Sequence, residues 1–239
     1  MLMKEFAKKM LKSNALGRAV YEPLHWVYRL YSVPHRKRML QKHGRATLQR
    51  IIEVFERHQV PGFVAAGSLL GLVRDGGFMP HDEDIDVGVL PGAWTPDRLL
   101  RMLVEEEGFK FEFAFQFRNR TVEFKVSWKG LPIDVFCYER EGTDFYCTCF
   151  YYFPEIKYPA ANANSVWRIH EYNIQSIRMM RVLDMDVPVP SEPEKVMEKL
   201  YGSDWRVPNP NWDDSMHPGR EVMEGEFGYS VTYEEAIKS

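Results

Sequence analysis

Apolar residues recur at every second position in three consecutive segments between Lys110 and Tyr138. The apolar positions are Phe111, Phe113, Phe115 and Phe117, then Val122, Phe124, Val126 and Trp128, then Leu131, Ile133, Val135 and Cys137. A period of two residues is typical of strands that bury one face. The region therefore predicts three successive β-strands, joined by two-residue turns at Asn119-Arg120 and Lys129-Gly130.

These turns fix the register, because a two-residue turn decides which residues of neighbouring strands lie opposite each other. One face is then expected to be apolar, with the pairs Phe117–Val122, Phe115–Phe124, Val126–Ile133 and Phe124–Val135. The other face carries Glu123, Lys125 and Asp134, with Lys125 directly across from Asp134 at a Cβ separation of about 5.5 Å. A carboxylate is thus predicted to project from the middle of the sheet.

Helical spacing of apolar residues indicates three core helices, at about 39–59, 95–108 and 191–202. Together with the strands they predict an α+β fold, a largely antiparallel sheet flanked by helices. We expect three regions, a basic helical appendage at 1–45, a core at 46–202, and an irregular tail at 203–239 packed on that core. The tail is expected to be irregular because prolines, asparagines and glycines are frequent there.

The composition is that of a folded protein, with 45% apolar and 27% charged residues among 239. The longest stretch without Asp, Glu, Lys or Arg is 58–73, and Pro61 and three glycines interrupt it, so no segment is predicted to cross a membrane. The N-terminus shows no signal-peptide pattern. Cys137, Cys147 and Cys149 fit neither a disulfide framework nor a four-ligand zinc site. A cytoplasmic location is expected.

Charge is distributed unevenly along the chain. Residues 1–45 hold eleven Lys or Arg against Glu5 and Glu22, a net charge of +9, whereas the whole chain has −3, so the remainder carries −12. A basic segment with interspersed apolar residues can lie on an anionic membrane surface, although a solvated appendage explains it equally well. Pro23 and Pro34 are expected to break it into short helices. The acidic remainder argues against nucleic acid as a partner.

Two acidic residues alternate with apolar ones in the segment that begins Asp84-Ile85-Asp86-Val87. In a strand, Ile85 and Val87 would enter the core, while Asp84 and Asp86 project side by side. Such carboxylates repel each other unless cations neutralise them, and Mg²⁺ prefers oxygen ligands. With Asp134 as a third ligand, the sequence predicts a site for one or two Mg²⁺, or Mn²⁺. Two aspartates spaced in this way, without a third ligand, are also common on solvated strand edges.

A small-residue turn, Gly67-Ser68, follows an apolar strand-like segment and opens a short apolar helix. Helix N-termini attract phosphate, so the backbone N–H groups and the Ser68 hydroxyl are expected to hold a phosphoryl oxygen, with Arg74 adding positive charge. The segment lacks the lysine of a P-loop. His81 and Asp82 flank the carboxylates and are expected either to orient a ligand, Asp82 as a substrate-binding residue, or to lie in a solvated loop.

The segment GSLLGLVRDGGFMPHDEDIDVGV, residues 67–89, resembles the signature of the LicD family, which includes phosphocholine transferases and is related to fukutin and fukutin-related protein. The similarity is close at 60–90 and looser at 133–136 and 187–210. It implies a nucleotidyltransferase fold of the DNA polymerase beta superfamily, with 46–202 as the catalytic core. Two departures are His81, where an aromatic residue is usual, and Glu83, where Asp is frequent.

The resemblance further implies a phosphate turn at Gly67-Ser68 and a catalytic metal triad of Asp84, Asp86 and Asp134. The implied reaction moves a substituted phosphoryl group, such as phosphocholine or an alditol phosphate, from a CDP-activated donor to a hydroxyl of a cell-surface glycan or glycolipid. CMP is released, as in the assembly of lipopolysaccharide or capsule.

The role of one basic residue and two other activities stay open. Lys125 either contacts a substrate phosphate or simply pairs with Asp134. The same metals would also serve nucleotidyl transfer from an NTP with release of pyrophosphate. A noncatalytic, peripheral membrane-binding protein is the third alternative.

Overall fold

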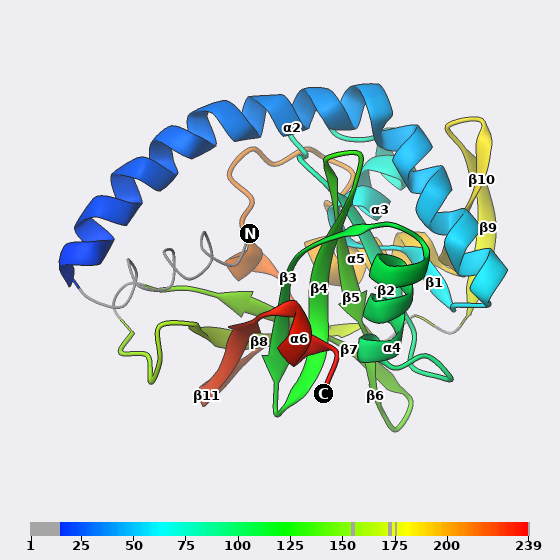
Figure 1. Cartoon of the computed structure of the whole chain (residues 1–239). Helices are drawn as coiled ribbons and strands as arrows, with labels where there is room; N and C mark the ends of the chain where they lie inside the picture. The colour runs from blue at the N-terminus through cyan, green and yellow to red at the C-terminus, as the bar shows by residue number, and fades with distance from the viewer. Residues whose placement is uncertain (1–14, 154–155, 172–173, 175, 239) are drawn as a thin grey trace.

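A mixed sheet forms the body of the protein in the computed structural model, which describes residues 15–153, 156–171, 174 and 176–238 (Figure 1). Within these residues the strand order is β1-β2-β5-β4-β3-β11-β8-β7-β6. The strands are β1 (Gly62–Val64), β2 (Ile85–Val89), β3 (Lys110–Phe117), β4 (Arg120–Trp128), β5 (Leu131–Cys137), β6 (Glu139–Glu141), β7 (Asp144–Tyr151), β8 (Ala163–Glu171) and β11 (Arg220–Val231). Only β2 and β5 pair in parallel among these neighbours. The predicted α+β fold with a largely antiparallel sheet is confirmed.

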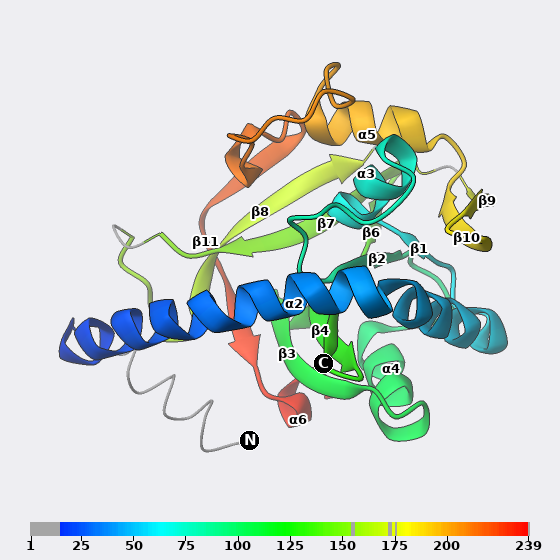
Figure 2. The same cartoon turned by 90° about the horizontal axis from the view of Figure 1, so that it is seen from above.

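Helices flank this sheet, and a separate hairpin packs beside it. The helices are α2 (Ala15–His58), α3 (Ala66–Arg74), α4 (Pro96–Arg101) with a π-helical continuation (Met102–Glu106), α5 (Pro193–Tyr201), a 3₁₀ turn (Asp214–Met216) and α6 (Tyr233–Ala236). The hairpin consists of β9 (Ile177–Val182) and β10 (Met185–Pro190). Figure 2 shows α3 and α5 on one side of the sheet and α4 on the other, with α2 passing across. Within the described residues, no helix combines the length and the apolar character needed to cross a membrane.

The hairpin of β4 and β5 has the predicted register. Lys125 lies opposite Asp134, and Val126 lies opposite Ile133. Lys129 and Gly130 form the turn with positive φ angles of 50° and 84°, as a tight hairpin turn requires. The prediction that a carboxylate and an ammonium group face each other in mid-sheet is therefore confirmed.

The predicted register of the β3–β4 hairpin is wrong. The turn residues are Arg118 and Asn119, both with positive φ, and Ala114 rather than Phe115 lies opposite Phe124. The pairing shifts twice along β3, and each irregularity changes the face to which the following side chains point. Such bulges cannot be detected from the alternation of apolar and polar residues in the sequence.

As a result, two aromatic residues leave the core face. Phe113 lies opposite Lys125 and Phe115 opposite Glu123, so both share the face of the polar residues. They are half-buried, whereas Phe111 and Phe117 remain buried. The expected apolar face therefore includes only part of β3, whereas β4 and β5 keep their buried apolar residues.

Helix α2 runs without a break from Ala15 to His58, and Figure 1 shows it arching over the ends of β3, β4 and β5. The expectation that Pro23 and Pro34 end short helices is wrong, because a proline removes one backbone hydrogen bond and can bend a helix without ending it. The proposed boundary at residue 45 falls inside this helix. Residues 1–14 of the basic segment lie outside the described residues.

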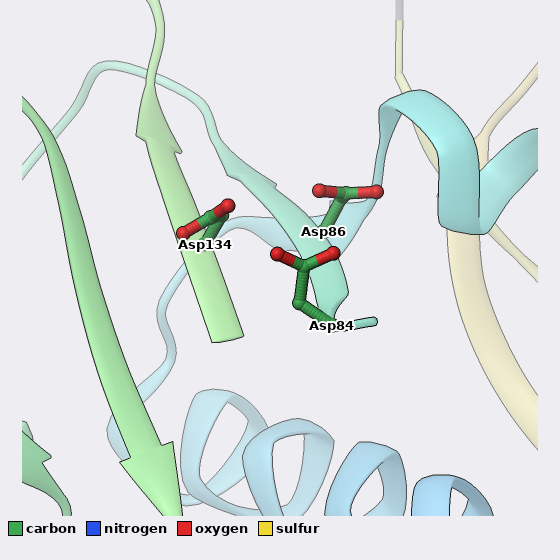
Figure 3. A group of neighbouring side chains, drawn as sticks. All are labelled: Asp84, Asp86 and Asp134. Carbon is green, nitrogen blue, oxygen red and sulfur yellow. The ribbon is translucent and has the colours of Figure 1, made fainter. Parts of the chain in front are cut away.

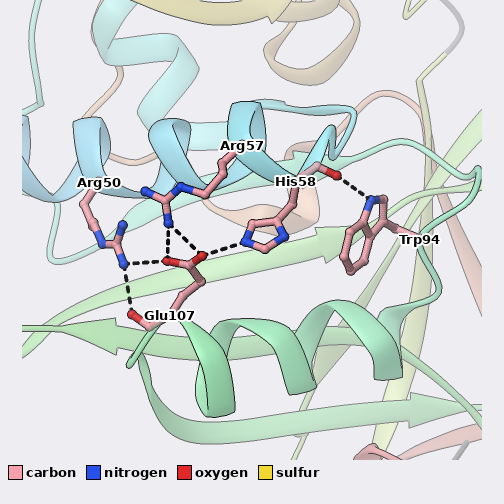
Figure 4. A network of polar contacts seen from close by, with 5 residues as sticks. All are labelled: Arg50, Arg57, His58, Trp94 and Glu107. Carbon is pink, nitrogen blue, oxygen red and sulfur yellow. Dashed lines mark hydrogen bonds and ion pairs between the residues drawn. The ribbon is translucent and has the colours of Figure 1, made fainter.

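The buried carboxylate of Glu107 joins α2 to the helix that follows β2 (Figure 4). Arg50 Nη2 lies 2.7 Å from Glu107 Oε2, Arg57 Nη1 2.8 Å from Oε1, and His58 Nε2 2.6 Å from Oε1. These partners, His58 first, lower the pKa of Glu107 to about 2. Trp94 Nε1 also donates a hydrogen bond to the His58 carbonyl, 3.1 Å away. The cluster fixes the long helix against the domain.

Replacing Glu107 by Gln is expected to lower the free energy of unfolding at neutral pH by about 3 kcal/mol, because the change removes the buried carboxylate of an ion-pair network with Arg50 and Arg57. The ordinary carboxyl pKa of 4.5 falls to about 2 in the folded protein, so this stabilisation is complete above pH 4.5 and fades as pH falls toward 2. Urea denaturation at pH 7 and pH 3 should show a gap between the two proteins that narrows in acid. An equal loss for the exposed control Glu56→Gln would contradict this.

The C-terminal region is more regular than predicted. Turns occupy much of 203–219, but residues 220–231 form β11, which pairs with both β3 and β8. The expectation of an irregular tail at 203–239 is therefore wrong for this strand and for α6. The register of β11 shifts between Val222 and Phe227, around Gly225, and this bulge interrupts the alternation by which a strand is recognised in a sequence.

Candidate active site

Three carboxylates meet where β2 and β5 run side by side (Figure 3). The parallel pairing places Asp86 directly beside Asp134, and Asp84 precedes the first residue of β2. One oxygen from each of the three residues lies within 4.8 Å of the other two. The structure thus brings together the three acidic residues that the sequence singled out.

Ser68 holds Asp86 through two reciprocal hydrogen bonds, one to the carboxylate and one from the backbone. The backbone N–H of Ser68 donates to Asp86 Oδ2 at 3.0 Å, and the backbone N–H of Asp86 donates to Ser68 Oγ at 2.9 Å. Gly67 permits this approach, because a Cβ atom there would lie 3.3 Å from Asp86 Oδ2. The first turn of α3 therefore orients Asp86, and the Ser68 N–H is already engaged rather than free for a phosphate.

Lys125 reaches the same cluster from β4. Its Nζ lies 2.9 Å from Asp84 Oδ2 and 2.8 Å from Asp134 Oδ2. Its side chain is only 14% exposed, and Nζ lies 5.5 Å from the centre of the Phe113 ring. One ammonium group thus bridges carboxylates that belong to two different strands.

The cluster holds more carboxyl groups than this single ammonium group can pair with. Burial, and then the charge of Asp84, raise the pKa of Asp86 to about 7. Burial raises the pKa of Glu123, on the same face, to about 8, against the opposing effect of Lys125. Asp134 Oδ1 is buried, and no hydrogen-bond partner for it occurs among the described residues. Such hard oxygen atoms fit a divalent cation such as Mg²⁺ or Mn²⁺.

Two other predicted residues border the cluster. Arg74 makes two hydrogen bonds to Asp75, of 3.0 and 2.8 Å, and a third of 3.1 Å to Met79 Sδ. Burial raises the pKa of Asp82 to about 6, while His81, whose Nε2 lies 3.8 Å from Asp82 Oδ1, opposes this shift. The structure therefore places Arg74 in contact with its neighbours in sequence rather than with the three carboxylates.

Two residues near the cluster had no role in the sequence interpretation. Glu123 was expected on this face, but nothing in the pattern distinguished it from a solvated residue, whereas the structure buries it. Phe113 was expected in the core, because a bulge is invisible to a period-two count. Burial of an acidic strand residue beside other acids is a signal that only the folded structure supplies.

The fold and the cluster define a class of protein: an α+β domain in which neighbouring strands bring three carboxylates together. The family described as "LicD/FKTN/FKRP, nucleotidyltransferase domain" matches residues 59–192. The chain belongs to this family, as its resemblance to the LicD signature predicts.

Curated relatives include proteins named ribitol-5-phosphate transferase FKTN. The mouse (Mus musculus) protein is 23% identical over 183 residues, which cover 75% of this chain and 37% of the relative. The human (Homo sapiens) protein is 23% identical over 181 residues, 74% of this chain and 36% of the relative. The chain thus spans little more than a third of the length of these relatives.

Proposed function

We propose that this chain moves a substituted phosphoryl group from a CDP-activated donor to a hydroxyl of a cell-surface glycan or glycolipid, with release of CMP. Alditol phosphates such as ribitol phosphate, and phosphocholine, are the candidate groups. The observation that carries the proposal is the meeting of Asp84, Asp86 and Asp134 within 4.8 Å in a domain of this family. The names of the curated relatives support an alditol phosphate.

The three aspartates would hold one or two divalent cations, Mg²⁺ or Mn²⁺. A bound cation supplies positive charge that offsets the charge developing on the donor's diphosphate. Ser68 keeps Asp86 in place for this task through its two hydrogen bonds. Asp134 is the candidate base, since its Oδ1 has no partner among the described residues.

The proposed transfer forms one bond, breaks another and moves one proton. A bond forms between the acceptor oxygen and the phosphorus that carries the head group. The bond from that phosphorus to the oxygen of CMP breaks, and CMP leaves with the electron pair. Asp134 accepts the proton of the acceptor hydroxyl. Positioning and charge supply the catalysis, as is usual for phosphoryl transfer.

Two measurements, made one after the other, test this proposal. A thermal-shift panel of CDP-ribitol, CDP-glycerol and CDP-choline, each with and without Mg²⁺, should show stabilisation by one donor, because a ligand of the native state raises its stability. Mass spectrometry with that donor and candidate acceptors should then show CMP and an acceptor that has gained the head group. An acceptor that gains a nucleotide, with pyrophosphate released from an NTP, would instead establish nucleotidyl transfer.

We further propose that the basic segment places the domain on the inner face of an anionic membrane. In the described part of that segment, Leu30 and Tyr31 are 58% and 75% exposed, and Arg38, Lys42 and Arg45 are exposed. Cations and apolar side chains on one helix suit a surface of anionic lipids.

The double variant Arg38→Gln/Lys42→Gln is expected to bind phosphatidylglycerol vesicles roughly 30-fold more weakly, since each cation near such a surface contributes about 1 kcal/mol. Sedimentation at low and high salt measures the effect. The matched variant Lys195→Gln/Lys199→Gln, which removes two exposed lysines from α5, should bind like the unaltered protein. Absence of binding by the unaltered protein at low salt would reject membrane association.

A further inference from the structure

The ammonium group of Lys125 occupies the oxygens that a divalent cation would need. It lies 2.9 Å from Asp84 Oδ2 and 2.8 Å from Asp134 Oδ2, and both residues belong to the proposed metal triad. The register of β4 and β5, which places Lys125 opposite Asp134, fixes this arrangement. Lys125 therefore acts as a counter-ion built into the sheet.

A divalent cation and this ammonium group compete for the same ligand atoms. Mg²⁺ binds carboxylate oxygens at about 2.0–2.1 Å and requires a near-octahedral arrangement of ligands. Like charges repel strongly where water is largely excluded, and the Lys125 side chain is only 14% exposed. The two cations cannot share both oxygens in their present positions.

The ring of Phe113 lies next to the ammonium group of Lys125 and can bind it after displacement. Phe113 lies opposite Lys125 because of the bulge in β3, and its ring centre is 5.5 Å from Nζ. The face of an aromatic ring attracts a cation at this range. The half-buried ring thus keeps the released side chain beside the site.

We propose that Lys125 is the resident counter-ion of the triad and gives up Asp84 and Asp134 when a divalent cation binds, remaining next to Phe113. This inference rests on the proposed function in one respect, that the triad binds a divalent cation. In the metal-free protein, Lys125 keeps three like charges together. In the loaded protein, it becomes a mobile positive group at the edge of the site.

Titration with Mn²⁺, followed through the electron paramagnetic resonance of the free ion, tests the competition. Lys125→Met is expected to bind Mn²⁺ about tenfold more tightly and to melt at a lower temperature without metal. Lys110→Met on the adjacent strand, where Lys110 is 66% exposed, removes the same charge and should leave both values unchanged. Unchanged or weaker Mn²⁺ binding by Lys125→Met would overturn the inference.

A second measurement uses the unaltered protein, so it does not depend on the folding of a variant. Acetylation of lysines with and without Mn²⁺, read by mass spectrometry, should label Lys125 several-fold more when the metal is bound, while Lys110 reacts equally in both states. Equal protection of Lys125 would overturn the inference while leaving metal binding established. If the unaltered protein does not bind Mn²⁺, this inference is overturned, and so is the metal dependence in the proposed function.

Discussion

Asp84→Asn is expected to lower the rate of CMP release from the preferred donor by roughly a thousandfold. The exchange keeps the shape of the side chain but removes one of three negative charges that would hold the metal, and metal-ion catalysis supplies several kcal/mol of transition-state stabilisation. Folding should persist, because Lys125 keeps its second partner, Asp134, at 2.8 Å. Rate, Mn²⁺ affinity and melting temperature should be measured together.

The matched control for this change is Asp186→Asn. Asp186 is an exposed aspartate of β10 whose carboxylate lies 3.6 Å from Arg181 in an exposed ion pair. Its replacement removes the same charge outside the cluster and should leave CMP release unaffected. Full activity in Asp84→Asn, with its altered cluster, would show that the three carboxylates do not carry the transfer.

Ser68→Ala is expected to weaken Mn²⁺ binding by roughly tenfold, the lower end of the usual effect of removing a group that orients a metal ligand, because the Ser68 backbone N–H still donates to the Asp86 carboxylate. The hydroxyl accepts the hydrogen bond of the Asp86 backbone N–H, and Ser68 is 1% exposed, so no solvent replaces it readily. CMP release at subsaturating metal should fall in parallel and recover in part when Mn²⁺ is raised. That recovery would distinguish a positioning role from direct participation in transfer.

Ser127→Ala serves as the control for this second prediction. Ser127 is also a buried serine, and its hydroxyl donates to Glu112 at 2.7 Å, outside the three-carboxylate cluster. It should lose stability without a change in Mn²⁺ affinity. An equal loss of affinity in both variants would indicate a general disturbance of the sheet, and no loss in Ser68→Ala would show that the hydroxyl does not position Asp86.

The parts of the fold that local rules determine were predictable from the sequence. A tight turn at Lys129-Gly130 fixed the register that sets Lys125 opposite Asp134, and alternation placed Asp84 and Asp86 together. The two irregularities in the β3–β4 pairing and the interruption in β11 were not predictable, because an extra residue in a strand is stabilised by its partners across the sheet.

The same limit applied to the candidate site. The residue types and their order indicated three carboxylates, and these do meet. The engagement of Ser68 with Asp86 depends on how α3 approaches β2, which spacing alone does not determine. The turn of Phe113 toward Lys125 follows from a bulge.

The position of β11 has a consequence for how the chain assembles. This strand lies between β3 and β8, so the sheet is continuous only after residues 220–231 have joined it. The strands around the carboxylates, β2, β5, β4 and β3, all lie on one side of that junction and come from residues 85–137. During synthesis, the half of the sheet that bears the carboxylates can therefore pair before the last strand emerges, and the edge of β3 remains open until then.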